Sequence, residues 1–141
     1  MKNFADYISE QTLSKSDLDG VEKYADRLYA AAGIDVEFTR HFLDRVNDSR
    51  NKKQITVAEL IRMFKQSYKK FGKKIAKLGP DAEAVLNDMQ TDINMPFVFK
   101  WDGKELDLVA KTVMRKRNFG TFNPKLSFEE FEFFPEKLHE R

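Results

Sequence analysis

The sequence predicts an α+β fold in which N-terminal helices pack on an antiparallel sheet of three or four strands. Between residues 57 and 78 the apolar residues recur at alternating steps of three and four, which is the spacing of one helix face. Beyond Asp92, apolar and polar residues alternate on both sides of Asp102-Gly103, a dipeptide typical of β-hairpins. A chain of 141 residues is long enough to build one self-sufficient core. We predict a separate N-terminal segment of residues 1–13, followed by a single domain of residues 14–141. Within this domain the helices are expected in residues 14–90 and the sheet in residues 95–133.

The first helix of the domain is predicted to begin after Ser14 or Ser16, either of which suits an N-cap. It should end near Gly33, because glycine readily adopts the left-handed conformation that follows a helix. We expect a short connector at Ile34–Phe38, for which an extended conformation is one alternative. Thr39 is then predicted to cap a second helix that runs to about Asn47.

The longest helix is predicted to open with a capping box formed by Thr56 and Glu59. Its apolar stripe consists of Ile61, Phe64, Tyr68, Phe71, Ile75 and Leu78. Because glycine weakens a helix interior, we expect a kink or break at Gly72. Gly79-Pro80 should end the helix, and Asp81 is predicted to cap a further short helix through Met89.

Three strands are predicted for the second half of the chain. They span Pro96–Trp101, Glu105–Arg115 and Phe119–Phe122, and Asp102-Gly103 joins the first two as a two-residue turn. The second strand should place Leu106, Leu108, Ala110, Thr112 and Met114 on one side of the sheet. The tail after Lys125 alternates acids with phenylalanines and is interpreted as a final strand or as an arm that wraps over the body.

Positive charge is concentrated in one part of the chain. Residues 39–78 hold twelve Lys or Arg against three acids, a local excess of nine, whereas the whole chain has a net charge of +2. A segregated basic surface indicates a polyanion partner, although a run of lysines is also typical of a solvated helix face. The residues that we predict to bind nucleic acid are Arg50, Lys52, Lys53, Arg62, Lys65, Lys69, Lys73, Lys116 and Arg117.

Composition excludes several function classes. The chain has no cysteine, so disulfides, thiolate metal ligands and cysteine nucleophiles are excluded. It has two distant histidines, which disfavours a zinc site, and it contains no Gly-rich phosphate loop or nucleophile elbow. We therefore predict no metal and no cofactor. No apolar run approaches the ~20 residues of a membrane span, so no membrane partner is expected.

The first ten residues, MKNFADYISE, place Phe4, Tyr7 and Ile8 on one face of a short amphipathic segment. This decapeptide resembles the capsid-targeting propeptides of large tailed phages, in Met1, Lys2, Phe4, Tyr7, Ile8 and Glu10. The resemblance implies cleavage after Glu10, in a site that includes Ile8, and packaging of the protein in the capsid interior before ejection into the host cytoplasm. The alternative is a docking helix or a frayed terminus.

A second resemblance concerns residues 38–124, and it is one of pattern and order. A helix carrying His41 and Arg45, followed by strands that carry Lys111, Arg115 and Thr121, resembles the small metal-independent nucleases of the barnase, EndoU, colicin and RelE type. The resemblance implies that His41 acts as the general acid or base. It also implies that Arg45, Lys111 and Arg115 hold the phosphate and that Thr121 donates to a phosphate oxygen. The alternative is that these side chains lie on ordinary solvent-exposed faces.

Two main functions are therefore compared. The first is a basic protein packaged in a phage head and ejected with the DNA, which binds nucleic acid or inhibits a host enzyme. The second is a metal-independent endoribonuclease. A plain nucleic-acid-binding module that uses the long helix is a third hypothesis. A concave pocket joining the five candidate catalytic residues would favour the enzyme, and a convex, evenly basic surface would favour the binders.

Overall fold

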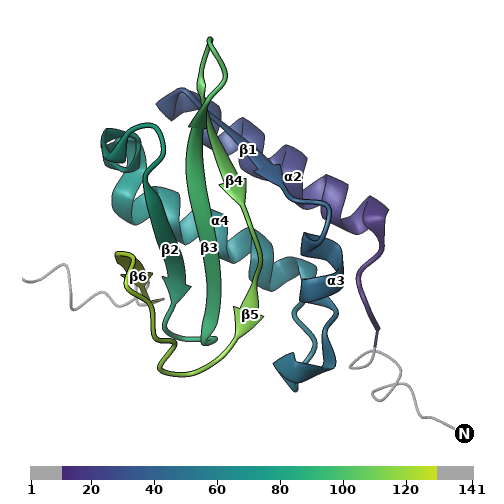
Figure 1. The fold of residues 1–141 in the computed structure, drawn as a ribbon. Coiled ribbons are helices and arrows are strands. Elements are labelled where there is room, and N and C mark those ends of the chain that lie inside the picture. Colours follow the sequence, from purple (N-terminus) through teal and green to yellow (C-terminus); the bar gives the residue numbers. More distant parts are fainter. Residues whose placement is uncertain (1–10, 130–141) are drawn as a thin grey trace, which may run out of the picture.

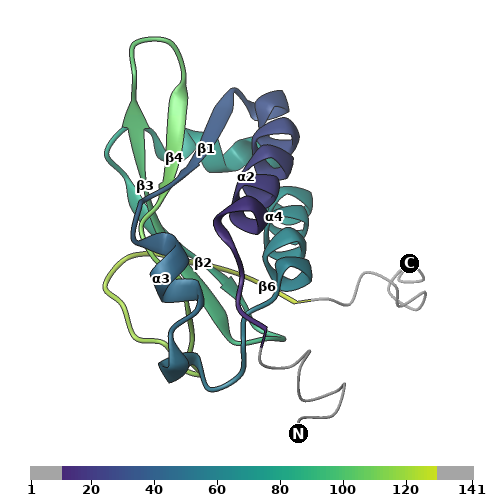
Figure 2. The ribbon, with the colours of Figure 1, turned by 90° about the vertical axis from the view of Figure 1, so that its right-hand side faces the viewer.

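The computed structural model describes residues 11–129, which form two layers, a six-stranded sheet with helices on one face (Figures 1 and 2). The α+β class predicted from the sequence is thus confirmed. The strands are β1 (Ile34–Phe38), β2 (Glu83–Asp88), β3 (Ile93–Trp101), β4 (Leu106–Ala110), β5 (Met114–Arg115) and β6 (Lys125–Phe128). Their order is β1-β4-β3-β2-β6, and β5 pairs with β3. The β1–β4 and β2–β6 pairs are parallel and the others are antiparallel, so the sheet is mixed.

Three α-helices lie in the first half of the described chain. They are α2 (Lys15–Tyr29), α3 (Phe42–Val46) and α4 (Val57–Phe71), supplemented by the 3₁₀ segments η1 (Ala30–Ala32), η2 (Ser49–Asn51) and η3 (Gly72–Leu78). Helices α2 and α4 cover the same face of the sheet, and α3 follows the end of β1 (Figure 2). Within the described residues, the opposite face of the sheet is not covered by a helix (Figure 2).

The caps predicted from the sequence are present at two helices. Ser14 and Asp17 form a capping box at the start of α2, and Thr56 and Glu59 form another at the start of α4. The predicted break at Gly72 is also confirmed, because α4 ends there with φ at 52°, a conformation that glycine adopts without a Cβ clash. The start of the second helix was predicted wrongly. Helix α3 begins at Phe42 and has no side-chain cap.

The core lies between the two helices and the sheet. Tyr29 of α2 packs edge-on against Phe64 and Tyr68 of α4, and its hydroxyl lies 2.7 Å from the Ser67 hydroxyl. Alternate residues of β3, including the fully buried Phe97, present the matching apolar surface. Two-thirds or so of the unfolded surface is removed from water in a domain of this size, so this layer supplies the main stabilising free energy.

The predicted division into helices before residue 90 and a sheet after residue 95 is wrong. Residues 83–88, predicted as helix, form the central strand β2 between β3 and β6. Five of its six residues are buried, so it lacks the apolar–polar alternation that identifies a half-exposed strand. The predicted connector at Ile34–Phe38 is strand β1, which makes the sheet larger and mixed instead of antiparallel with three or four strands.

The predicted hairpin is confirmed as a strand pair, because β3 and β4 are antiparallel, but its turn differs. Trp101 pairs with Leu106, so the loop holds residues 102–105. Asp102 Oδ1 accepts hydrogen bonds from the backbone N–H groups of Lys104 and Glu105, each at 2.9 Å. This Asx-type turn replaces the predicted two-residue turn. The predicted strand at Phe119–Phe122 is absent from the described residues, and the chain pairs again only at β6.

A bulge separates β4 from β5. Ala110 lies opposite Phe97 and Met114 lies opposite Asn94, so three residues on one strand face two on the other. The additional residue reverses the side-chain alternation beyond Lys111. Val113 is therefore buried, where the sequence pattern predicted Thr112 and Met114. Beyond the bulge, Arg115 turns toward α4 instead of the open face.

The outer edge of β1 is closed by helix α2. The backbone N–H groups of Val36 and Phe38 donate to the carboxylates of Asp26 and Glu22, at 2.6 and 3.1 Å. Covered N–H groups disfavour pairing with another strand at this edge. Within residues 11–129, no helix has the length and apolar character needed to span a bilayer.

Candidate nucleic-acid interface

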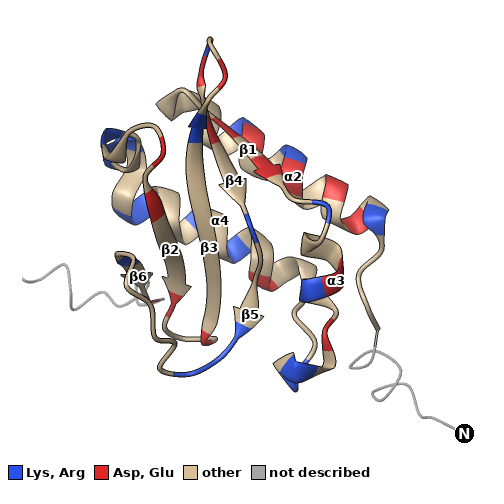
Figure 3. Ribbon diagram, in the orientation of Figure 1, with Lys and Arg blue, Asp and Glu red and all other residues tan. Residues whose placement is uncertain are grey.

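A pocket of about 1020 Å³ opens between the α3–η2 segment and the residues that follow β4. Its basic lining residues come from two stretches far apart in sequence, and they appear as the blue segments around α3 and β5 in Figure 3. These residues are Arg45, Arg50, Lys52, Lys53, Lys111, Arg115, Lys116 and Arg117. Only Asp48 and Asp92 are acidic, so the lining carries a formal excess of six positive charges. Such a concave basic surface focuses a positive potential on an anionic ligand.

Asn51 fixes the floor of the pocket. Its buried side-chain amide donates to the carbonyl oxygens of Arg45 and Val46, at 3.0 and 3.3 Å, and so ties η2 to the end of α3. Its Oδ1 accepts from the backbone N–H of Arg115 at 3.0 Å, which ties the same loop to β5. The two walls of the pocket are therefore held by one side chain. The role of Asn51 was not predicted, because a single asparagine in a polar loop has no distinguishing pattern.

Arg115, one of the candidate catalytic residues predicted from the sequence, is largely buried. Its guanidinium forms a two-point contact with Glu59, at 2.8 and 3.1 Å. The same group donates to the carbonyl oxygens of Lys53, Gln54 and Thr91, so all five of its N–H donors are used. Only 13% of the Arg115 side chain and 17% of the Glu59 side chain are exposed. Arg115 therefore supports the pocket wall and has no donor left for a phosphate.

The charge state of Glu59 follows from this contact. Burial acts to raise the pKa of Glu59, but the hydrogen bonds from Arg115 and from the Thr56 backbone outweigh it and hold the pKa below its ordinary value. Glu59 is consequently ionised at neutral pH. The pair joins the start of α4 to β5 and links the pocket wall to the core helix.

Four basic side chains at the pocket lack a partner in the described part of the chain. Arg45, Lys52, Lys53 and Lys116 are exposed, and their charged groups form no hydrogen bond or ion pair within residues 11–129. Their positive charges are available to an incoming anion without the loss of an existing contact.

Other basic groups at the pocket have acidic partners. The Arg50 guanidinium donates a hydrogen bond to Asp48 Oδ2 at 2.8 Å and lowers the pKa of that carboxyl to about 2. Arg117 lies 3.4 Å from Asp92. Lys111 lies 3.0 Å from Glu83 and holds the pKa of that carboxyl below its ordinary value. These pairs are exposed and weak, so an anionic ligand can compete for the cations.

Of the five candidate catalytic residues, the structure brings His41, Arg45, Lys111 and Arg115 to the pocket and leaves Thr121 out. His41 immediately precedes α3 and Arg45 lies one turn later, with the backbone N–H of Arg45 bonded to the carbonyl of His41. The His41 ring is exposed and makes no hydrogen bond within residues 11–129. Thr121 lies in the loop before β6 and accepts from the Asn123 backbone.

The predicted nucleic-acid-binding residues separate into two groups. Arg50, Lys52, Lys53, Lys116 and Arg117 line the pocket. Lys65, Lys69 and Lys73 are exposed on α4 and η3 and take no part in it. Arg62 lies 3.0 Å from the fully buried Asp88 of β2, so its guanidinium helps to hold α4 on the sheet. The predicted processing residues Ile8 and Glu10 lie outside the described residues.

Comparisons with known proteins add no information about the function of the pocket. No family model matches the chain, and neither the curated proteins nor the solved structures give a match.

Proposed function

We propose that the protein binds the phosphate backbone of nucleic acid in the basic pocket between α3, η2 and β5. The observation that carries the proposal is the gathering of eight Lys or Arg against two acids around one cavity. Four of these cations have no partner among residues 11–129, and the walls behind them are fixed by Asn51 and Arg115. Such contacts neutralise phosphates without reading base edges, so binding is expected to depend weakly on sequence.

The experiment measures fluorescence anisotropy of labelled single-stranded RNA, single-stranded DNA and duplex DNA of one length, over a range of salt concentrations. If about four phosphates are neutralised, log K should fall against log salt with a slope of roughly −3 to −4. Tight binding that is insensitive to salt, or no binding at low salt, contradicts the proposal.

A matched pair of variants locates the interface. The pocket variant carries Lys52→Glu, Lys53→Glu and Lys116→Glu, and the helix variant carries Lys65→Glu, Lys69→Glu and Lys73→Glu. Both change the net charge equally, and all six lysines are exposed. The pocket variant should lose affinity by about 100-fold or more at low salt, and the helix variant by only a few-fold, because screening weakens distant charges. Equal losses would assign binding to the overall charge instead of the pocket.

A metal-independent endoribonuclease is the second candidate, favoured by the position of His41 beside Arg45 and Lys111 in one concave pocket. In this reaction His41 takes the proton of the RNA 2′-OH as that oxygen bonds to phosphorus. The bond from phosphorus to the 5′-oxygen breaks, and water supplies a proton to the leaving oxygen. Arg45 and Lys111 balance the charge of the phosphorane. Arg115 and Thr121 are left out of this scheme, because Arg115 has no donor available and Thr121 does not line the pocket.

An RNA digest in chelator distinguishes the two candidates. The enzyme should leave a 2′,3′-cyclic phosphate and spare DNA, and His41→Ala should lower the rate by about 10²–10⁴. The matched control is Arg40→Ala, which removes an exposed neighbouring side chain that does not line the pocket. Binding without cleavage in wild type, or full activity in His41→Ala, leaves nucleic-acid binding as the function.

The setting of this binding follows from the N-terminal resemblance. We propose that the protein is packaged in a phage head and enters the host cytoplasm with the DNA, where the pocket engages nucleic acid or a host protein. The support is the decapeptide ending in Ile8-Ser9-Glu10. Co-expression with a prohead protease should yield a chain that begins at Gln11, read by mass spectrometry. An intact Met1, with a control substrate cut, contradicts packaging by this route.

A further inference from the structure

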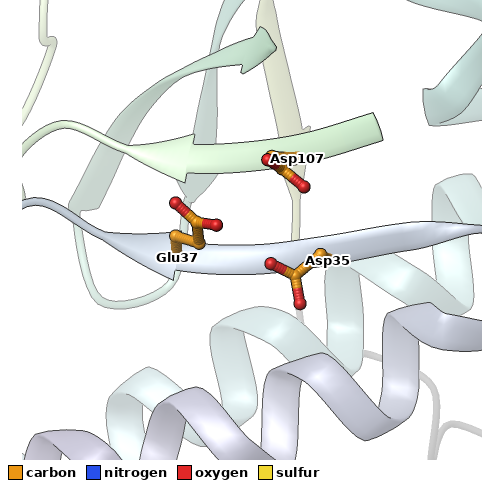
Figure 4. Close-up of side chains that lie close together, drawn as sticks. All are labelled: Asp35, Glu37 and Asp107. Atoms are coloured by element: carbon orange, nitrogen blue, oxygen red, sulfur yellow. The ribbon is translucent and has the colours of Figure 1, made fainter. Parts of the chain in front are cut away.

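A cluster of carboxylates lies on the open face of the sheet, away from the basic pocket. In the parallel pairing of β1 with β4, Asp35 lies opposite Asp107 and Glu37 follows two residues along β1. All three side chains point to the face that α2 and α4 leave uncovered, and their carboxylates converge in Figure 4. One ligand oxygen from each lies within 4.8 Å of the others. The β3–β4 loop adds Asp102 and Glu105, which form a second such group with Asp107.

Asp107 belongs to both carboxylate groups, and it has a buried oxygen that is suited to bind a metal ion. Only 7% of the residue is exposed, and its Oδ1 is buried without a hydrogen-bond partner in the described chain. A buried carboxylate oxygen without a partner is unfavourable, because desolvation is not offset by any contact. Its neighbours Asp102 and Glu37 are carboxylates, so no positive charge of the cluster faces this oxygen.

No basic side chain of the described chain neutralises the cluster. None of the five carboxylates forms an ion pair with Lys or Arg within residues 11–129. Lys100 lies directly across from Asp107 on β3, but its amine lies 3.5 Å from Asp81 instead. Asp26 of α2 adds a further negative charge beside Asp35.

The same repulsion appears in the pKa values. Burial, followed by the charge and hydrogen bonding of Asp26, raises the pKa of Asp35 to about 7. Burial and the neighbouring Asp102 and Glu37 raise the pKa of Asp107 to about 6.

We propose that Asp35, Glu37 and Asp107 bind a hard divalent cation on the open face of β1 and β4. The site offers only carboxylate oxygens, the ligands of Ca²⁺, Mg²⁺ and Mn²⁺, and no nitrogen or sulfur for a softer metal. Asp102 and Glu105 lie beside Asp107 and supply further oxygens for a cation with a large coordination number such as Ca²⁺. Asp35 and Asp107 are far apart in the sequence, which is why no metal site was predicted from it.

Calorimetric titration of the full-length protein with CaCl₂, MgCl₂ and MnCl₂ at pH 7.5, without nucleic acid, tests the proposal. Wild type should bind at least one of these cations with one-to-one stoichiometry. Saturating cation should also raise the melting temperature by about 3 °C or more relative to NaCl of equal ionic strength. At pH 5.5 both effects should weaken, because protons compete for the same oxygens.

Asp107→Asn and, separately, Glu37→Gln should abolish the one-to-one binding while leaving the protein folded, since each keeps the side-chain size and removes a repelling charge. The matched control is Asp44→Asn, which removes an exposed carboxylate of α3 outside the cluster and should bind as wild type does. Two outcomes overturn the proposal, namely no binding of any of the three cations by wild type, and equal binding by wild type and Asp107→Asn.

Discussion

The basic pocket lies beyond the C-terminal ends of β1 and β4, and the acidic cluster lies on the same two strands, whose charged segments Figure 3 colours. Both gather like charges, but they do so differently. The pocket cations extend from α3, η2, β5 and the loops beside them, and Arg50, Lys111, Arg115 and Arg117 each have an acidic partner. The cluster carboxylates lie on paired strands, where the register forces them together without a counter-charge.

The two regions are therefore suited to different ligands. Exposed cations around a wide cavity can contact several phosphates of an extended polyanion. Carboxylates that converge from fixed backbone positions suit one small cation instead. The buried contacts of the pocket are made by Asn51 and by the Arg115–Glu59 pair, which lie behind the exposed cations.

The largest expected effect comes from breaking the support of the pocket. Arg115→Leu leaves Glu59 half-buried and charged and removes five hydrogen bonds, so the free energy of unfolding should fall by about 3 kcal/mol. Arg117→Leu is the matched control. Its side chain is 80% exposed and its loss should change stability by less than about 0.5 kcal/mol. Urea unfolding measures both. A small effect of Arg115→Leu would show that the side chain faces the ligand after all.

The next effect concerns pH, and the two regions should respond with opposite signs. Asp35 and Asp107 have pKa values raised in the folded state, so the folded protein holds protons that the unfolded chain releases, and stability falls as pH rises from about 4 to 7. Glu59 has a lowered pKa, so its contribution is present above its ordinary value of 4.5 and is lost as pH falls below it. Thermal melts in metal-free buffer should therefore show maximum stability near pH 4.

Asp107→Asn tests the repulsion among the carboxylates directly. In metal-free buffer at pH 8 the variant should melt about 3 °C or more above wild type, because a buried carboxylate no longer repels its neighbours. The fall in stability between pH 5 and pH 8 should become shallower. Glu59→Gln should remove the acid side of the profile instead and lower stability at neutral pH. A variant Asp107→Asn that is less stable than wild type at pH 8 would contradict the repulsion.

The smallest effect belongs to an exposed pair at the mouth of the pocket. Lys111→Gln breaks the contact with Glu83, in which both side chains are more than 40% exposed, so stability should change by less than about 0.5 kcal/mol. Affinity for nucleic acid should fall by about tenfold or less at low salt, and the magnitude of the salt slope should fall by about one, as expected for one lost phosphate contact. An unchanged salt slope would place Lys111 outside the interface.

Local signals were predicted well. The caps at Ser14 and Thr56 and the break at Gly72 depend on neighbouring residues, and all three are confirmed. Strand β2 was missed because a strand buried on both faces has no alternation, and a short apolar run then reads equally well as helix. Strand β1 was missed because its partner β4 lies far away in the sequence.

The candidate site shows the same limit. His41, Arg45, Lys111 and Arg115 were identified by residue type, and the structure does place them at one pocket. Their different roles were beyond the sequence. The bulge before Met114 turns Arg115 inward to Glu59, and a shift of one residue in a strand reverses the direction of every side chain that follows.

The α+β class, the ends of the main helices and the separation of basic from acidic segments were predictable, because they depend on residue type and on spacing within one helical turn or strand repeat. Which charges meet depends instead on long-range contacts of the folded chain. The parallel pairing of β1 with β4 brings Asp35 to Asp107, and the α3–η2 loop brings Lys52 and Lys53 to Lys116. Such contacts join residues far apart in the chain, and strand register and packing set them, for which local sequence carries no signal.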